Sequence, residues 1–359
     1  MTTYYQELEH KITLELRSML KNMPYYCTDF LRGISNSTES RTQLAYCRDI
    51  YHFLQFVHDH NPEYKNKSVR ELDFELLEKL TASDIDEYLE YLSYYEIDNK
   101  AYQNGNAAKA RKLSSLSKFY TFFVKRGLLQ NNPITAIERP KINEKAIISL
   151  NQNQIYELIE KTLEPTDLTE RQMKFHAMTK IRDRAILMTL LGTGMRVSEL
   201  VGLDLTDVDF KEQTLRVVRK GGKEAFVYFG EDVYDALQEY LLADVDGDLP
   251  SSSPRSRFLK PEKETNALFL SLRGSRITVR SVEILTKKYS SMLATNKTIT
   301  PHKLRSTFGT DVYNKTGDIY LTAKSLGHKD INVTSKHYAS MDEDKLREAA
   351  DIFSGKNKE

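Results

Sequence analysis

A break in helical periodicity between residues 127 and 150 limits what this chain can fold into. Before the break, apolar residues recur at helical spacing, and the clearest such helix is expected over residues 107–126. The break contains Pro133 and Pro140, which interrupt helices. We therefore expect a helical domain over residues 1–138, an interdomain linker over 139–150 and a second domain over 151–359.

The second domain contains a short β-rich stretch among helical segments. Residues 214–219 and 224–229 are rich in Val, Phe and Tyr, and a Gly-Gly pair between them favours a tight turn. Residues 267–270 (ALFL) are expected to add a third strand to this sheet. Helices are expected near residues 151–163, 181–191, 231–243, 278–292, 301–315 and 318–326. The predicted fold class is therefore mostly α with a small antiparallel β-sheet.

The charge distribution indicates a phosphate-binding face despite a net charge of only +1. Residues 100–127 carry seven basic side chains and no acidic one, and residues 273–305 are basic with Glu283 as the only acid. A neutral total can conceal such a face, and the local potential is what a nucleic acid encounters.

Several classes of protein and site are disfavoured. No run of about 18 apolar residues exists, so we expect no membrane association through a span. The N-terminus shows no signal-peptide pattern, and Cys27 and Cys47 have neither metal-like nor redox-like spacing. A reducing, cytoplasmic location is expected. The cluster at residues 58–60 (His-Asp-His) lacks further placed ligands, so no metal site is expected.

Four polar segments of the second domain carry residues that suit phosphate chemistry. They are LGTGMRVSEL (191–200), RKGGK (219–223), TPHKLR (300–305) and LGHKDINVTSKHYA (326–339). Taken singly, each has a structural explanation. Arg196 can pair with Glu199, Lys220 can be a solvated turn lysine, and Tyr338 is one of 21 tyrosines.

The third segment illustrates why the combination is more informative. Thr300 is a suitable N-cap and Pro301 a suitable first helical residue, so His302 and Arg305 lie three residues apart at a helix start. A helix N-terminus, an imidazole and a guanidinium together favour binding of a phosphate or another oxyanion. A surface arginine beside a packed histidine remains the structural alternative.

Together the four segments resemble the active-site motifs of the tyrosine recombinase (phage integrase) family. That family's catalytic set is Arg, Lys, His-x-x-Arg, His or Trp, and Tyr, in this order. GTGMRVSELVGLDLTDVD resembles the first family motif, and TPHKLRSTFGT and KSLGHKD resemble the second. The last two catalytic residues lie one position further apart here than in most members. The matching candidates are Arg196, Lys220, His302, Arg305, His328 and Tyr338, with Glu199 orienting them.

The resemblance extends to the N-terminal half and implies a SAM-like domain that binds the core DNA site. The helix expected over 107–126 resembles the last helix of that domain. Its polar residues at positions 109, 112, 115 and 118 are expected to lie away from its apolar stripe. The residues expected to contact DNA are Lys109, Arg111, Lys112, Ser115, Lys118, Lys223, Arg276 and Arg280.

The resemblance also implies a reaction and an assembly. Tyr338 would attack a phosphodiester and form a 3′-phosphotyrosine, without metal, ATP or another cofactor. A homotetramer would hold two double-stranded DNA sites, and strand exchange would pass through a Holliday junction. A helix over 341–353 would dock on a neighbouring protomer. The length resembles Xer-type recombinases of chromosome-dimer resolution, assisted by an accessory protein (a translocase or an excision factor). A mobile-element integrase/excisionase and a type IB topoisomerase are the alternatives.

Overall fold

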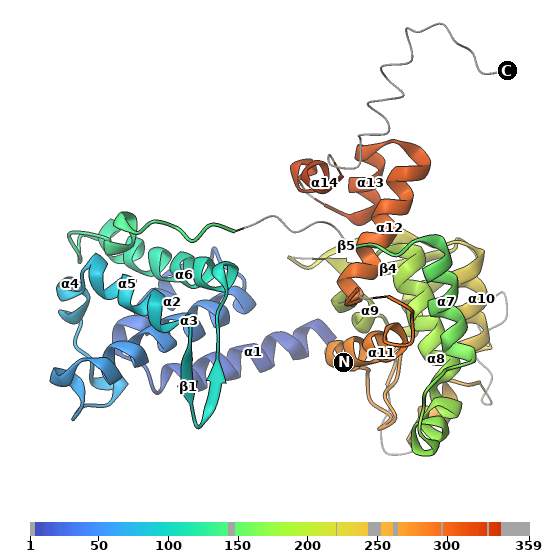
Figure 1. The fold of residues 1–359 in the computed structure, drawn as a ribbon, viewed down its shortest axis with the longest axis horizontal. Coiled ribbons are helices and arrows are strands. Elements are labelled where there is room, and N and C mark those ends of the chain that lie inside the picture. Colours follow the sequence, from blue (N-terminus) through green and yellow to red (C-terminus); the bar gives the residue numbers. More distant parts are fainter. Residues whose placement is uncertain are drawn as a thin grey trace, which may run out of the picture. The chain divides into compact units, whose positions relative to one another are not determined.

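The chain forms two compact units, Met1–Lys145 and Ala146–Glu359, in the computed structural model (Figure 1). The division falls within residues 139–150, the expected linker, whose bounds stay a prediction. Among the described helices, none combines the length and apolar character needed to cross a lipid bilayer. The structure describes residues 4–142, 148–219, 221–242, 253–260, 265–295, 297–328 and 330–338.

The first unit is helical and its core is aromatic. Phe30, Phe53, Tyr88, Phe119 and Tyr120 are each at most 1% exposed. Leu113, Leu116 and Phe123 complete the predicted apolar stripe of α6, which begins and ends within one residue of the expected bounds. The elements are α1 (Tyr4–Leu20), α2 (Tyr25–Ile34), α3 (Ser40–His60), η1 (Pro62–Tyr64), η2 (Val69–Glu71), α4 (Leu76–Lys79), α5 (Ala82–Tyr91), α6 (Asn106–Lys125) and η3 (Pro133–Ala136).

A small hairpin in this unit was not predicted. Strands β1 (Tyr95–Ile97) and β2 (Lys100–Tyr102) pair antiparallel. Their turn residues Asp98 and Asn99 have φ of 50° and 59°, the left-handed values that a two-residue hairpin turn requires. The Asp-Asn pair was the available sequence signal.

The second unit places a three-stranded sheet among helices (Figure 1). Its predicted helices are confirmed with small shifts at their ends, except that α8 begins eleven residues before the expected start. A Thr169–Gln172 capping box marks this beginning. The helices are α7 (Gln152–Leu163), α8 (Glu170–Thr193), α9 (Val197–Gly202), α10 (Glu231–Leu241), α11 (Val279–Ser290), α12 (Pro301–Thr316), α13 (Ile319–Leu326) and α14 (Ile331–Tyr338), with η4 (Leu205–Asp207) and η5 (Ser256–Phe258).

The sheet has the order β3-β4-β5 and is antiparallel throughout. Strands β4 (Thr214–Arg219) and β5 (Lys223–Tyr228) form the predicted hairpin. The third strand is β3 (Val208–Asp209), so the prediction that residues 267–270 join this sheet is wrong.

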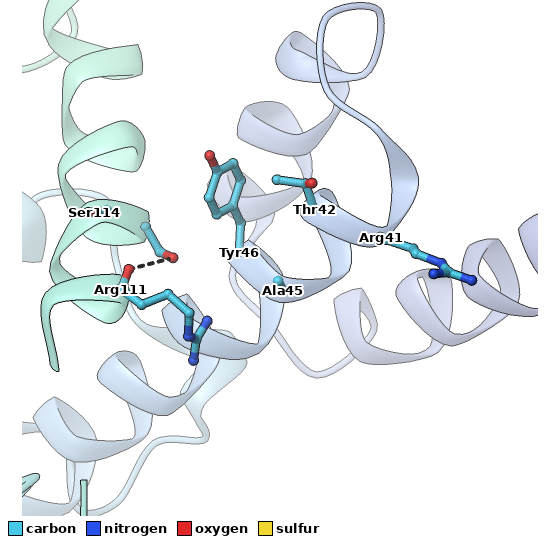
Figure 2. A pocket seen from close by; sticks show the side chains of 7 residues that line it. Arg41, Thr42, Ala45, Tyr46, Arg111 and Ser114 are labelled. Atoms are coloured by element: carbon cyan, nitrogen blue, oxygen red, sulfur yellow. Dashed lines mark hydrogen bonds between the residues drawn. The ribbon is translucent and has the colours of Figure 1, made fainter. Parts of the chain in front are cut away.

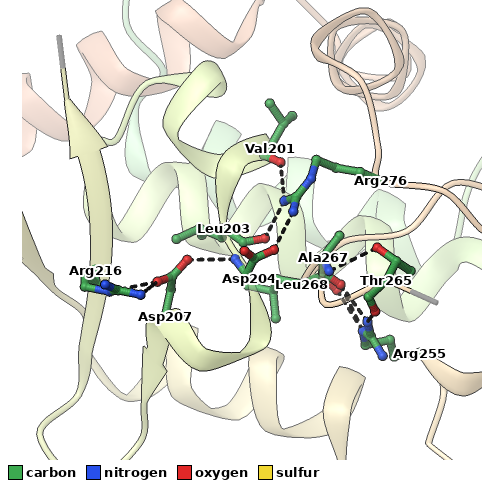
Figure 3. Close-up of polar contacts among 10 residues, drawn as sticks. All are labelled: Val201, Leu203, Asp204, Asp207, Arg216, Arg255, Thr265, Ala267, Leu268 and Arg276. Carbon is green, nitrogen blue, oxygen red and sulfur yellow. Dashed lines mark hydrogen bonds and ion pairs between the residues drawn. The ribbon is translucent and has the colours of Figure 1, made fainter. Parts of the chain in front are cut away.

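Residues 267–270 are buried, and isolated β-bridges together with arginine side chains, rather than a place in the sheet, satisfy their backbone. Arg255 donates to the carbonyl oxygens of Ala267 and Leu268 (Figure 3), and Arg182 donates to that of Leu270 at 2.7 Å. A buried apolar run needs partners for its polar backbone, and arginines supply them here as well as a strand would.

Candidate active site

Arg196 is held in place by a buried carboxylate at the start of α9. Glu199, which is 4% exposed, accepts hydrogen bonds from the backbone N–H of Arg196 at 2.8 Å and from its Nη1 at 2.9 Å. The Arg196 side chain still keeps 42% of its surface exposed. The carboxylate therefore orients a guanidinium that remains partly accessible to solvent, and the role of Glu199 in a catalytic site stays a prediction.

The Gly-Thr-Gly bend before Arg196 brings α8 close to α12. Gly194 ends α8 with a left-handed φ of 61°, and a Cβ at this position would overlap the ring of Phe308. Only glycine meets both demands without strain. The bend thus allows the close packing of α8 against α12.

Arg305 joins three of the four motif segments. It is 5% exposed, and its Nη1 donates to the Gly194 carbonyl at 2.5 Å while its Nη2 donates to the Leu326 carbonyl. The same helix begins as predicted, with Thr300 as N-cap and Pro301 in the first turn. His302, one residue further on, is exposed. The segments of Arg196, His302 and His328 therefore meet around one buried guanidinium.

His328 connects this cluster to the helix that carries Tyr338. Gly327 ends α13 at a φ of 63°, and the His328 backbone N–H donates to the Ala323 carbonyl at 2.9 Å. His328 Nδ1 lies 2.7 Å from Oγ1 of Thr334, which is fully buried in α14. Tyr338 is the last residue of α14, one helical turn after Thr334.

The hairpin that carries Lys220 approaches the same place. Lys220 itself lies outside the described residues, between the end of β4 at Arg219 and the start of β5. Gly221 and Gly222 have φ of 82° and 73°, which confirms the tight turn. A Cβ at Gly327 would overlap the guanidinium of Arg219, so the hairpin end lies against the residue before His328.

The predicted DNA-contacting face of α6 requires a correction. Lys112 and Ser115 are 7% and 2% exposed, so the expectation that both lie away from the apolar stripe is wrong. They surround Asp49 of α3, which is 2% exposed. Ser115 Oγ donates to Asp49 Oδ2 at 2.6 Å, and Lys112 Nζ lies 3.7 Å from Oδ1. A buried carboxylate requires such partners, and the sequence separation of more than 60 residues concealed them.

The other candidates on α6 remain partly accessible. Arg111 makes a two-pronged contact with Asp49, donating at 2.8 Å from Nη2 and again from Nη1, yet its side chain is 55% exposed. Lys118 is exposed, and Lys109 donates to Ser93 at 2.6 Å. Helices α3 and α6 enclose a shallow hollow lined by Arg41, Thr42, Ala45, Tyr46, Arg111, Ser114 and Ser115 (Figure 2).

The candidate DNA-contacting residues of the second unit differ in how far other protein groups already bind them. Arg276 donates to the carbonyls of Val201 and Leu203 at 3.0 and 2.8 Å and pairs with Asp204 (Figure 3), so it anchors the end of α9. Arg280 is 78% exposed beside Glu283 at 3.2 Å, and Lys223 is exposed at the start of β5. Whether these side chains contact DNA stays a prediction.

Within the described part of the chain, no group of three or more His, Cys, Asp or Glu side chains is placed to hold a metal ion. Cys27 and Cys47 are free thiols, and both are buried. The motif segments that meet at the Arg305 guanidinium are the main chemical feature of the second unit.

Comparison with known proteins assigns these features to one family. A model of the phage integrase family matches residues 149–345. The tyrosine recombinase XerC of Leptospira interrogans is 30% identical over 316 residues, which are 88% of each protein. The structure of the Tn1549 transposon integrase in complex with a circular intermediate DNA aligns with a TM-score of 0.61 at 20% identity, over 92% of this chain and 99% of that one. XerH bound to its difH substrate aligns with a TM-score of 0.57 at 21% identity, over 89% and 82%.

Proposed function

Because the chain belongs to the phage integrase family, we propose that it is a Xer-like site-specific tyrosine recombinase that uses Tyr338 to cleave and rejoin double-stranded DNA. One observation carries the assignment of the site. Arg305 bonds the carbonyls of Gly194 and Leu326, which draws together the segments that contain Arg196, His302 and His328. Segments far apart in the sequence thereby meet at one buried guanidinium.

Two guanidiniums suit the transition state of this reaction. When a nucleophile attacks a phosphodiester, negative charge grows on the non-bridging oxygens, and preorganised donors stabilise it strongly. Arg305 is fixed by two carbonyls and Arg196 by Glu199, so neither must reorganise when the charge appears. We assign both to the scissile phosphate, with Glu199 as the group that positions Arg196.

The remaining roles concern protons. A tyrosine hydroxyl has an ordinary pKa near ~10, so its attack at neutral pH needs a base, which we assign to His302. The leaving 5′ oxygen needs a proton, which we assign to Lys220 at the hairpin tip. His328 would donate a hydrogen bond to the phosphate from Nε2, since its Nδ1 lies next to the Thr334 hydroxyl. Tyr338 bonds to the 3′ phosphate, and the 5′ hydroxyl of another strand later displaces it, so no ATP is consumed.

The assembly and the cellular role complete the proposal. The first unit would hold the core DNA site, with the accessible Arg111 and Lys118 among its contacts. Four protomers on two sites would exchange strands through a Holliday junction, joined by a helix over 341–353, which lies outside the described residues. Chromosome-dimer resolution in the cytoplasm, timed by a translocase or an excision factor, is the role we favour.

Covalent capture of DNA tests this proposal. The full chain and its Tyr338→Phe variant are incubated with fragmented bacterial genomic DNA, denatured in detergent, and any DNA attached to protein is sequenced. We expect one recurring site with the unaltered chain and none with the variant. Equal attachment in both would move the nucleophile to another tyrosine, and attachment at unrelated positions would favour a topoisomerase. A recurring site at a replication terminus would support chromosome-dimer resolution, whereas a mobile-element end would support integration.

A further inference from the structure

Arg219, the last residue of β4, is half-buried and differs from the buried arginines of the second unit. Arg182, Arg255 and Arg305 each donate hydrogen bonds to backbone carbonyls. Arg219 Nε is buried, yet no hydrogen-bond partner for it exists within the described part of the chain. A buried cationic donor without a partner is costly unless a ligand supplies one. The side chain therefore indicates an anion that is bound during function.

The position of Arg219 identifies where that anion would lie. Its guanidinium packs against Gly327, where a Cβ would overlap Nη1, Cζ and Nη2. The residue before Gly327 is Leu326, whose carbonyl accepts from Arg305, and the residue after it is His328. Covalent geometry then keeps the guanidiniums of Arg219 and Arg305 within about 10 Å of each other.

The glycine at position 327 makes this approach possible. Its φ of 63° is one that side chains rarely adopt, and the absent Cβ leaves the space that the guanidinium occupies. Arg219 also directly precedes Lys220, our candidate for the general acid. The end of β4 thus places one more positive charge where the phosphate is expected, and no acidic side chain among the described residues pairs with it.

We propose that Arg219 is a further catalytic residue, whose guanidinium binds a non-bridging oxygen of the scissile phosphate together with Arg196 and Arg305. This inference rests on the proposed function. In the free protein the guanidinium packs against Gly327. The phosphate would supply the hydrogen-bond acceptor that Nε lacks among the described residues. Arg219 takes part in no bond-forming step.

The experiment measures single-turnover cleavage of a duplex that contains the site found by covalent capture. The full chain is compared with Arg219→Gln, which is polar but uncharged and shorter, and with Arg219→Lys, which keeps the charge. Arg216→Ala is the matched control. It removes a guanidinium from the opposite face of the same strand, where Asp207 and Glu224 already pair with it. Thermal melting and DNA-binding titrations show whether each variant is folded.

A second substrate separates a phosphate contact from a structural effect. It carries a neutral methylphosphonate in place of the scissile phosphate and so removes the charge that Arg219 would bind. On the ordinary duplex we expect Arg219→Gln to slow covalent complex formation about 10- to 100-fold, in the range lost with one oxyanion donor, and Arg219→Lys to recover part of the rate. On the methylphosphonate duplex the deficit should shrink to a few-fold, while Arg216→Ala stays within about two-fold throughout.

Two results would overturn the assignment. Cleavage by Arg219→Gln at the rate of the unaltered chain would mean that the guanidinium does not touch the phosphate. An equal loss of rate on both duplexes would mean that Arg219 only supports the structure around Gly327. A variant with a lower melting temperature that is slow on both duplexes would mean the same. If the unaltered chain forms no covalent complex at all, the proposed function fails instead, so the two failures are distinguishable.

Discussion

The buried carboxylate of Asp49 should hold α3 against α6, and Asp49→Asn tests this directly. The change keeps the size and the acceptor for Ser115 but leaves the Lys112 ammonium, 9% exposed, without a counter-charge. Removing one partner of a buried ion pair costs roughly 3–5 kcal/mol. Because the pair is 3.7 Å apart and Arg111 is half exposed, we expect the lower end, about 3 kcal/mol.

Amide hydrogen exchange of the full chain is the appropriate assay, because two units need not unfold together. Since one tenfold change corresponds to about 1.4 kcal/mol, the amides of α3 and α6 should exchange roughly 100-fold faster in Asp49→Asn. The double variant Asp49→Asn/Lys112→Met should recover about 1–2 kcal/mol of the loss, since it removes the stranded charge as well. Burial also lowers the pKa of Lys112, which fits this dependence on Asp49.

The control is Glu15→Gln, which removes an exposed partner of Arg48 and should cost less than about 1 kcal/mol. If Asp49→Asn accelerates exchange no more than this control, the buried charge does not hold the helices. Strict additivity in the double variant would likewise contradict the coupling of the two side chains.

Three further predictions concern the second unit and one half-buried histidine of the first unit. Thr334→Val should slow covalent complex formation about tenfold, because it removes the hydrogen bond to His328, whereas Thr334→Ser should retain most of the rate; equal rates would contradict the role of the bond. Gly327→Ala should cost about 1–3 kcal/mol in thermal unfolding through its positive φ and steric overlap, while Gly230→Ala, which meets no atom within 4 Å, should be nearly neutral; similar losses would refute the packing argument. Burial lowers the pKa of His52 to about 4, below its ordinary 6.5, so the unfolded chain binds a proton at a higher pH than the folded chain does. The contribution of His52 to stability should therefore be full above pH 6.5 and fall as the pH drops toward 4. Thermal melts across that range should show a flatter slope for His52→Asn, and an unchanged slope would contradict the prediction.

Local signals in the sequence were sufficient for most elements of the second unit. The alternation of β-formers around Gly-Gly predicted β4 and β5, and Thr300-Pro301 predicted the start of α12. These features depend on neighbours a few residues apart, so periodicity and capping reveal them. The early start of α8 was missed although its capping box was present, because the first turns of that helix are mostly exposed and their apolar residues, such as Met173 and Phe175, do not mark a buried face.

Contacts between distant segments could not be predicted from the sequence. Nothing near residue 112 indicates that the Lys112 ammonium will pack against Asp49. Likewise, nothing near residue 267 indicates that Arg255 will donate to the Ala267 carbonyl. For the site, the family resemblance supplied the candidate residues, whose roles stay predictions, while the links through Arg305 and through Thr334 emerged only from the structure. The buried Arg219 Nε, which has no hydrogen-bond partner among the described residues, likewise has no signal in its own segment.

Peptide mapping of the covalent complex tests the central claim most directly. The trapped protein–DNA adduct is digested with nuclease and protease, and the peptides are analysed by mass spectrometry for a retained nucleotide. The proposed reaction predicts a 3′-linked nucleotide on Tyr338 and free 5′-hydroxyl ends on the released DNA. A nucleotide on any other residue, or a 5′ linkage, would contradict it.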